Sequence, residues 1–330
     1  MMFMTNIEII FIKSEYSKNT CFGPFETCKD IYKALSTKHS VRITICTNQF
    51  DLKNVVTRNP DLVILTNKVV TDTCGRPLWL ADFFEKHGIN YTGSNVESLK
   101  LDSDKISSKL QVKSQGIRTA RFFTAVPGQY NNPEDIPIPF PLFIKPNNTA
   151  NSDGVDKDSC AVSFASFKKK IAELFLIYKK PLLVEEYLSG REFTVSIIDS
   201  KVRSIAPVEI IPPINNNIRI LSKKVKDDDS ETLREVTDKK TCKQLSSLAI
   251  ASFMALKARD FGRIDIKMDS HGNCYFMEAN LTPGMKKTSS YFPVSYSLSS
   301  TLKYDVIINR IIQAAIDRKN NTSNRLEAKI

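Results

Sequence analysis

The chain has 330 residues, which is too long for one small hydrophobic core and suits two or three packed units. Hydrophobic residues make up 42% of it and charged residues 25%, and no apolar run approaches the ~20 residues that cross a bilayer, so no membrane association is expected. The net charge of +11 suits nucleic acid or small anions such as nucleotides. Because the basic residues form no single stripe with interleaved aromatic residues, we expect no nucleic-acid partner.

Cysteine and histidine usage points to a reducing compartment. The seven cysteines are an odd number without a Cys-x-x-Cys pair, and the three histidines lack metal-ligand spacing. This pattern argues against a disulfide framework and against a zinc site. The N-terminal stretch has no basic region and contains Glu8, so it is interpreted as a strand and not as a signal peptide. A cytoplasmic location is expected.

Strand-like and helix-like stretches alternate over the first 92 residues. The strand-like stretches lie at 7–12, 41–46 and 60–66. The helix-like stretches lie at 25–38 and 78–88. Alternation of this kind predicts a parallel α/β unit.

Beyond residue 92 the sequence predicts four more helices, three strands and a hairpin. The helices lie within 91–117 and at 164–180, 241–258 and 304–317. The strands lie at 141–145, 182–188 and 191–199. The segment 222–243 is rich in charge and poor in apolar residues, which predicts a mobile loop or an exposed helix start. The polar tail from Lys319 is expected to fray.

The hairpin within 262–281 carries the strongest chemical signal. Apolar and polar residues alternate on both sides of a two-residue turn that we place at 271–272. This register puts Asp265 opposite Glu278 and Arg263 opposite Asn280. Facing side chains lie ~5 Å apart, where like charges repel, so the two carboxylates need compensation.

A divalent cation would supply that compensation. Mg²⁺ takes hard oxygen ligands from one or two carboxylates together with substrate phosphates. Asp265, Glu278 and Asn280 are therefore candidate metal ligands, with the positive charge of Arg263 beside them. The alternative is that these residues line the wet face of an ordinary hairpin, and a slip of the turn by one residue would remove the alignment.

Two lysines are candidates for binding an anion, although both familiar glycine-rich phosphate loops are absent. Lys145 ends an apolar strand, and Lys105 lies on the helix after "YTGSN". A lysine that ends a buried strand is costly unless an anion meets it. The polar loop 147–155 could fold its N–H groups over phosphates. Solvated lysines and a plain surface turn are the alternatives.

Acidic residues also lie among apolar ones in "LLVEEYLSGREFTV". Carboxylates there can accept hydrogen bonds from an adenine amino group or from ribose hydroxyls. Salt bridges to nearby lysines are the alternative.

These stretches occur together in one order that is typical of a known superfamily. They are "YTGSN…DSDK", "LFIKPNNTANSDGV", "LLVEEYLSGREFTVSIID" and "GRIDIKMDSHGNCYFMEANLTPGM", which together span roughly residues 91–290. The chain resembles the ATP-grasp carboxylate–amine ligases and, within them, the D-alanine–D-alanine ligases. The last stretch is the most specific, because it holds Arg-x-Asp, Glu-x-Asn and Pro-Gly-Met at the spacing of that family.

The resemblance implies an α/β (α+β) protein with the ATP-grasp fold. An N-terminal parallel α/β domain would cover residues 1–92. A central ATP-grasp subdomain would cover 93–180, and a C-terminal subdomain with the metal and substrate site would cover 181–330. The two subdomains would grip ATP between them.

The resemblance also implies roles for individual residues at the nucleotide. Lys105 and Lys145 would contact the phosphates of ATP, under a loop that keeps Ser152 and Gly154. The adenine pocket would be lined by Glu185, Glu186, Tyr187 and Leu188. Glu192 would bind the ribose.

Metal, catalytic and substrate residues follow from the same resemblance. Asp265, Glu278 and Asn280 would hold two Mg²⁺ ions, with Mn²⁺ as an alternative. Arg263 would steady the transferring phosphate, and Lys223 or Lys224 would reach in from a mobile lid. Gly284 and Ser289 would hold the acceptor amino acid.

Three departures limit what the resemblance implies about substrates. The N-terminal Gly-Gly-x-Ser-x-Glu stretch of the family is missing, and Glu15 and Glu26 are weak stand-ins for its glutamate. The loop 147–155 lacks the family's Gly-Ser-Ser-Val-Gly. Lys286 and Lys287 follow Pro-Gly-Met, where small or polar residues are usual, and could meet a more acidic acceptor.

We therefore expect an ATP-dependent ligase that forms an amide bond between amino acids through an acyl phosphate, with substrates that need not be D-alanine. Two alternatives are a genuine cell-wall D-alanine–D-alanine ligase and a non-catalytic nucleotide-binding relic. The expected partners are small amino acids, and family members are often homodimers. The sequence identifies neither the substrate pair nor a dimer surface.

Overall fold

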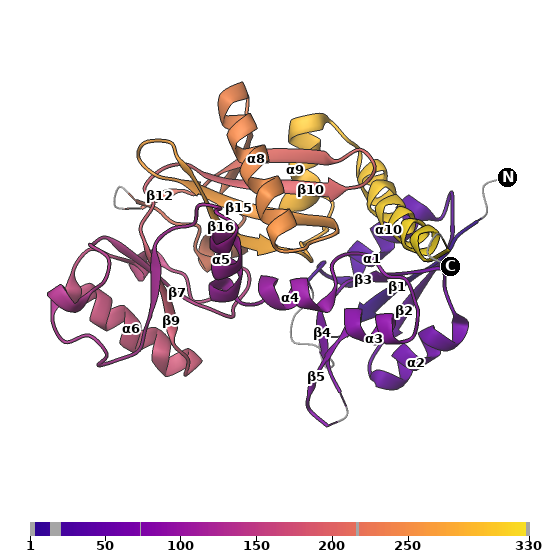
Figure 1. The fold of residues 1–330 in the computed structure, drawn as a ribbon, viewed down its shortest axis with the longest axis horizontal. Helices are drawn as coiled ribbons and strands as arrows, with labels where there is room; N and C mark the ends of the chain where they lie inside the picture. Colours follow the sequence, from indigo (N-terminus) through magenta and orange to yellow (C-terminus); the bar gives the residue numbers. More distant parts are fainter. Residues whose placement is uncertain (1–3, 14–20, 73, 216–217, 328–330) are drawn as a thin grey trace.

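The computed structural model describes residues 4–13, 21–72, 74–215 and 218–327 (Figure 1). Its N-terminal part holds a parallel three-stranded sheet in the order β2-β1-β3. The strands are β1 (Asn6–Ile12), β2 (Ser40–Cys46) and β3 (Leu62–Leu65). The accompanying helices are α1 (Phe25–Leu35), α2 (Gln49–Arg58) and α3 (Leu80–Lys86). The parallel sheet predicted for this region is confirmed.

Both faces of that sheet are buried, as parallel sheets require. Val63 and Leu65 of β3 belong to one core cluster, whereas Leu62 and Ile64 belong to another. A small hairpin of β4 (Val69–Thr71) and β5 (Pro77–Trp79) extends from the same region.

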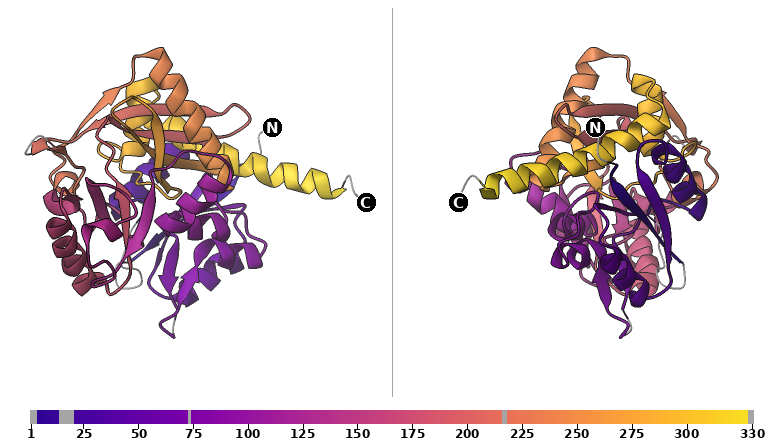
Figure 2. Two further views of the ribbon diagram at one scale, coloured as in Figure 1. Left: turned by 60° about the vertical axis from the view of Figure 1, so that its left-hand side comes forward. Right: turned by 90° about the vertical axis from the view of Figure 1, so that its right-hand side faces the viewer.

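The last helix, α10 (Tyr304–Glu327), packs on the N-terminal sheet although it comes from the opposite end of the chain. Ile307 and Ile311 share a core cluster with residues of β1 and α1. The far end of α10 projects from the molecule in both views of Figure 2. Its backbone stays helical as far as Glu327, so the fraying expected from Lys319 is not observed.

A second sheet is antiparallel and has the strand order β6-β9-β7-β8. Its strands are β6 (Phe122–Ala125), β7 (Leu142–Pro146), β8 (Cys160–Ala161) and β9 (Leu182–Glu186). Helix α6 (Phe164–Tyr178) packs on this sheet through Phe167, Ile171 and Leu174. Two short 3-10 turns, at Pro133–Asp135 and Lys157–Ser159, lie in its loops.

The third sheet has five antiparallel strands in the order β14-β11-β10-β15-β16. The strands are β10 (Glu192–Asp199), β11 (Ser204–Ile211), β14 (Thr232–Glu235), β15 (Asp260–Met268) and β16 (Cys274–Asn280). The helices around it are α4 (Val96–Asp102), α5 (Lys105–Ser114), α8 (Lys239–Ala255) and α9 (Tyr291–Ser300). None of the helices that the structure describes combines the length and apolar composition of a membrane crossing.

The charged segment predicted as a loop or exposed helix start is more ordered than expected. It contains the short helix α7 (Lys223–Asp227) and the strand β14, which pairs with β11 at the sheet edge. A further two-stranded hairpin, β12 (Ile214–Asn215) and β13 (Ile218–Arg219), precedes it. Residues 222–235 are called the lid segment below.

The register of the β15–β16 hairpin agrees with the prediction at the site end and departs from it at the turn. Asp265 pairs with Glu278, and Arg263 pairs with Asn280. The loop is longer than the predicted two residues, because Asp269 bonds to Asn273 across it. Near the turn the register is therefore shifted by one residue, and a β-bulge after Asp265 restores it.

Candidate active site

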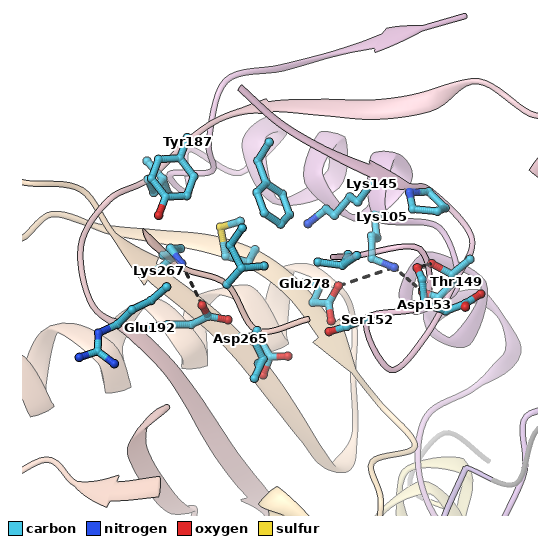
Figure 3. Close-up of a pocket in the computed structure, with 18 of the residues that line it drawn as sticks. Lys105, Lys145, Thr149, Ser152, Asp153, Tyr187, Glu192, Asp265, Lys267 and Glu278 are labelled. Carbon is cyan, nitrogen blue, oxygen red and sulfur yellow. Dashed lines mark hydrogen bonds and ion pairs between the residues drawn. The ribbon is translucent and has the colours of Figure 1, made fainter. Parts of the chain in front are cut away.

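A pocket lies between the second and third sheets (Figure 3). The predicted site residues that line it are Lys105, Lys145, Ser152, Glu186, Tyr187, Leu188, Glu192, Asp265 and Glu278. The predicted residues outside its lining are Gly154, Glu185, Lys223, Lys224, Arg263, Asn280, Gly284 and Ser289. Lining residues that the sequence did not single out include Phe143, Thr149, Arg219, Lys226, Lys267 and Met277.

One end of the pocket is largely apolar. Phe143 and Tyr187 stack there, with ring centroids 6.5 Å apart and ring planes 28° apart. Leu188 and Met277 add aliphatic surface. A planar, weakly polar ring such as adenine suits such a wall, because aromatic and aliphatic side chains cover its faces.

Lys105 brings a cation to the other end of the pocket. It is the first residue of α5, whose N-terminus is capped by Asp104 through a 2.8 Å bond from the Ser107 N–H. Its ammonium lies 3.6 Å from Glu278 and donates to the carbonyl of Thr149. Burial lowers the pKa of Lys105 although Glu278 opposes this, so a further anion would stabilise its charge.

Lys145 is the next-to-last residue of β7 and lies beside a buried carboxylate. Its ammonium lies 2.7 Å from Glu185, and the ammonium of Lys109 lies 2.5 Å from the other oxygen of the same carboxylate. Glu185 and Lys109 are fully buried. Burial would raise the pKa of Glu185, but the two lysines lower it below its usual value.

Glu185 therefore lies behind the pocket wall, where it fixes Lys145, and not at the apolar end of the pocket. Lys109 was missed by the sequence analysis. The available signal was its position one helical turn after Lys105, on the side of α5 that also buries Val112.

The loop 147–155 follows β7 and contacts the start of α5. The Asn147 side chain accepts a 2.9 Å bond from the N–H of Ile106. Ser152 lines the pocket with a backbone φ of 55°, which is left-handed. At Gly154 a Cβ atom would lie 2.5 Å from the Pro146 ring, so this glycine permits close packing of the loop on β7.

Glu192 at the start of β10 meets a partner that the sequence did not reveal. Lys267 faces it across the β10–β15 pair, with 2.9 Å between the ammonium and the carboxylate. Lys267 also lies 5.9 Å from the ring centroid of Tyr187. Both residues line the pocket, and Glu192 can still accept hydrogen bonds from hydroxyl groups through its other oxygen.

Asp265 is held by three donors. The Arg263 guanidinium bonds to both of its oxygens, at 3.0 and 3.2 Å. Thr194 donates to it at 2.6 Å, and the Asn280 amide nitrogen donates at 3.0 Å. Arg263 is nearly buried, so this pairing fixes its orientation as well.

Glu278 is less engaged than Asp265. Its side chain is 27% exposed, and its ion pair with Lys105 is longer than a hydrogen bond. Burial would raise the pKa of its carboxyl, but Lys105 and Lys145 outweigh this and lower the pKa from 4.5 to about 2. The carboxylate is thus ionised at neutral pH and available to a cation.

These residues fit a hard divalent cation. The donor set consists of two carboxylates and the amide oxygen of Asn280, whose nitrogen is the atom turned toward Asp265. The described part of the chain contains no cluster of three or more acidic, histidine or cysteine side chains. Phosphate oxygens would therefore have to complete the coordination, as Mg²⁺ sites commonly require.

Three lysines of the lid segment behave differently. Lys223 pairs with Asp227 on the exposed side of α7, at 2.6 Å, and Lys224 is exposed. Lys226 lines the pocket and lies 5.9 Å from the ring centroid of Tyr291. The lid cation that the structure brings to the pocket is therefore Lys226.

The predicted acceptor residues lie in the loop that follows β16. A Cβ atom on Gly284 would lie 2.8 Å from the Ser290 hydroxyl, so the loop is tightly packed there. Ser289 is partly buried, whereas Lys286 and Lys287 are exposed. Of the two stand-in glutamates, Glu26 is in the first turn of α1 and Glu15 lies outside the described residues.

Comparisons with known proteins identify the family of the chain. The family model described as "D-ala D-ala ligase C-terminus" matches residues 112–313. D-alanine–D-alanine ligase B of Clostridium perfringens is 27% identical over 242 residues, which cover 72% of this chain and 76% of that protein. The D-alanine–D-alanine ligase of Actinobacillus pleuropneumoniae is 27% identical over 231 residues, which cover 69% of this chain and 73% of that one.

Solved structures share the fold along almost the whole chain. The D-alanine–D-alanine ligase of Bacillus anthracis, solved in complex with ATP, superposes with a TM-score of 0.75 at 21% identity, over 96% of this chain and 99% of that one. The enzyme of Coxiella burnetii gives a TM-score of 0.71 at 17% identity, over 98% and 97%. The predicted fold and resemblance are thus confirmed: the chain belongs to the D-alanine–D-alanine ligase family and is an ATP-dependent ligase with the ATP-grasp fold.

Proposed function

We propose that the chain uses ATP to join the carboxylate of one amino acid to the amine of another. The observation that carries this proposal is that Asp265 and Glu278 face each other in the same pocket as Lys105 and Lys145. Paired carboxylates beside two cations suit a polyphosphate with a divalent metal.

Each part of the chain would then have one task. Residues 93–180 and 181–330 would hold the nucleotide between them, and residues 1–92 would complete the amino-acid site. Lys105 and Lys145 would bind phosphate oxygens, with Ser152 and the loop around it above them. Phe143, Tyr187, Leu188 and Met277 would enclose adenine, beside Glu186. One carboxylate oxygen of Glu192 would accept hydrogen bonds from the ribose hydroxyls, while Lys267 binds the other oxygen.

Asp265, Glu278 and Asn280 would hold Mg²⁺, or Mn²⁺ in its place. The metal ions would neutralise the negative charge of the phosphates during transfer. Arg263 keeps Asp265 in place and brings a positive charge to the same face.

The chemistry has two steps. An oxygen of the donor carboxylate attacks the terminal phosphorus of ATP, the bond to the bridging oxygen breaks, and ADP leaves. The acceptor ammonium gives one proton to a phosphate oxygen of the acyl phosphate, and the freed lone pair attacks the carbonyl carbon. The C–O bond to phosphate then breaks, phosphate departs with that electron pair, and the nitrogen loses its second proton to water. Arg263 would stabilise the charge on the carbonyl oxygen in between. Because water would destroy the acyl phosphate, the lid segment with Lys226 should close over it.

The substrates are proposed more broadly than in the relatives, because the family's N-terminal glutamate motif is missing. A second candidate is D-alanine on both sides, which the names of the Clostridium and Actinobacillus relatives favour. The two candidates differ only in the amino acids that stimulate the enzyme.

The test is release of ADP with Mg²⁺ and a panel of D- and L-amino acids, singly and in pairs. Stimulation by one pair would support the proposal, and stimulation by D-alanine alone would support the second candidate. Glu278→Gln should lower the rate by at least about a hundredfold, the effect expected when a group that offsets transition-state charge is lost. Equal rates for wild type and this variant would refute the assignment of Glu278.

A further inference from the structure

Glu231 lies in the lid segment, and its two carboxylate oxygens have different surroundings. Its Oε1 accepts a bond from the hydroxyl of Tyr291, the first residue of α9. Its Oε2 is buried and has no hydrogen-bond partner among the described residues. A buried carboxylate oxygen without a donor is costly, which indicates that a donor from outside the chain belongs there.

The surroundings of this oxygen link it to the reacting centre. The Tyr291 ring lies 5.0 Å from the guanidinium carbon of Arg263 and 5.9 Å from the ammonium of Lys226. Arg263 in turn holds Asp265, which lines the pocket. Glu231 is therefore separated from the proposed phosphate-transfer site by a single aromatic ring and the arginine that packs on it.

Tyr291 also follows the loop in which the acceptor residues are expected. Ser290 immediately precedes it and bonds to the N–H of Lys286 at 2.9 Å. Gly284 packs against the same serine. The oxygen of Glu231 thus lies where the candidate acceptor loop meets the lid segment.

We propose that Glu231 binds the amino group of the acceptor amino acid and that Tyr291 is the positioning residue for its carboxylate. This inference rests on the proposed function. An amino acid reaches the site as an ammonium ion, which carries three donors and a positive charge. An oxygen held in one orientation by Tyr291 can pair with it and so direct the nitrogen toward the acyl carbon.

The hydrogen bond to Glu231 also affects the acidity of the Tyr291 hydroxyl. Burial raises the pKa of the Tyr291 hydroxyl, and the bond to Glu231 raises it further. The hydroxyl therefore remains a proton donor to Glu231 throughout the working pH range. Glu231 keeps one oxygen for Tyr291 and one for the substrate.

The experiment compares two acceptors in wild type and in Glu231→Gln. Glutamine can still accept a bond from Tyr291, so the lid segment should keep its shape, but it cannot form a charged pair. The amino acid that stimulates wild type most should show a KM raised roughly tenfold to hundredfold, the value of a charge-assisted bond. The KM for ATP should not change.

Hydroxylamine supplies the matched control. It is uncharged at neutral pH and traps the acyl phosphate as a hydroxamate, so it needs no ammonium-binding carboxylate. Hydroxamate formation should therefore proceed at the wild-type rate in Glu231→Gln. Tyr291→Phe should raise the acceptor KM by a smaller factor, with hydroxamate formation again unchanged.

Two results would overturn this inference and leave the proposed function intact. One is an acceptor KM in Glu231→Gln equal to that of wild type, which would assign the buried oxygen to water. The other is an equal loss of hydroxamate formation and of the acceptor reaction, which would make the Tyr291 contact a latch of the lid segment. A wild type that releases no ADP with any amino acid would overturn the proposed function together with this inference.

Discussion

The two sides of the candidate site differ in how their charges are paired. On the nucleotide side, Glu185 contacts two lysines at 2.5 and 2.7 Å, and Lys105 approaches Glu278 at 3.6 Å. These groups sit on regular helices and strands. On the amino-acid side, Lys286 and Lys287 are exposed in a loop, and one oxygen of Glu231 has no hydrogen-bond partner within the described part of the chain. The charges on the nucleotide side are thus paired within the chain, whereas the Glu231 oxygen on the amino-acid side has no such pairing among the described residues.

This contrast explains why ATP handling and substrate choice can change independently. A buried ion network tolerates few substitutions, since removing one partner leaves the others uncompensated. An exposed loop tolerates many, because its side chains lose little when they change. Two of the three departures from the family, the missing N-terminal motif and the Lys286–Lys287 pair, concern the second side, whereas the third, loop 147–155, lies on the first side.

The largest expected effect comes from breaking the buried network. Glu185→Gln leaves the ammonium groups of Lys109 and Lys145 without a counter-charge, so it should lower the free energy of unfolding by about 3–5 kcal/mol. Glu186→Gln is the matched control, because the neighbouring carboxylate pairs with Arg121, whose side chain is 62% exposed. Glu186→Gln should lower the free energy of unfolding by less than about 1 kcal/mol. Urea unfolding of wild type and the two variants measures both changes. Similar losses of unfolding free energy in the two variants would show that the buried pairs of Glu185 contribute no more than the exposed pair of Glu186.

A smaller effect separates the lysines of the lid segment. Lys226→Ala should lower kcat by about tenfold to hundredfold, because it removes a cation that lines the pocket. Lys223→Ala should change kcat by less than about twofold, because this lysine is committed to an exposed pair with Asp227. Steady-state ADP release with saturating substrates compares the two. A larger loss in Lys223→Ala would mean that α7 turns when ATP binds and presents a different lysine.

The hairpin shows how far sequence could predict the site. The opposition of Asp265 and Glu278 is present, although the turn that was used to derive it is placed differently. Two departures cancel: the loop is longer than two residues, and the bulge after Asp265 returns the strands to the predicted register. Alternation of side chains fixes which residues share a face, but a bulge depends on the tertiary fit of the strand.

Residues whose partners come from distant elements were not predictable. Lys109 of α5 and Glu185 of β9 form an ion pair although they lie far apart in the sequence, and nothing within either stretch reveals that contact. Likewise, the orientation of α7 decides which of its lysines faces the pocket. The resemblance indicated which stretch of the chain contributes a cation. Which side chain of that stretch reaches the site depends on tertiary packing.

The smallest expected effect is the pH dependence of stability that comes from Glu278, the partly exposed carboxylate of the nucleotide side. The pKa of Glu278 is lowered from 4.5 to about 2 in the folded protein. Its carboxylate therefore contributes stability that is fully present above pH 4.5 and is lost as the pH falls toward 2, because the unfolded chain takes up the proton first. Glu278→Gln lacks this proton uptake, so the stability difference between wild type and variant should shrink as the pH falls over that range.

Urea unfolding of both proteins at pH 6, 4.5 and 3.5 measures the difference, and carboxylates common to the two proteins cancel in the subtraction. Parallel stability curves would mean that Lys105 and Lys145 do not hold Glu278 ionised. Glu278 on the nucleotide side would then resemble Glu231 on the amino-acid side, because neither carboxylate would be stabilised by a cation of the chain. Both would require a bound ligand to supply the positive charge.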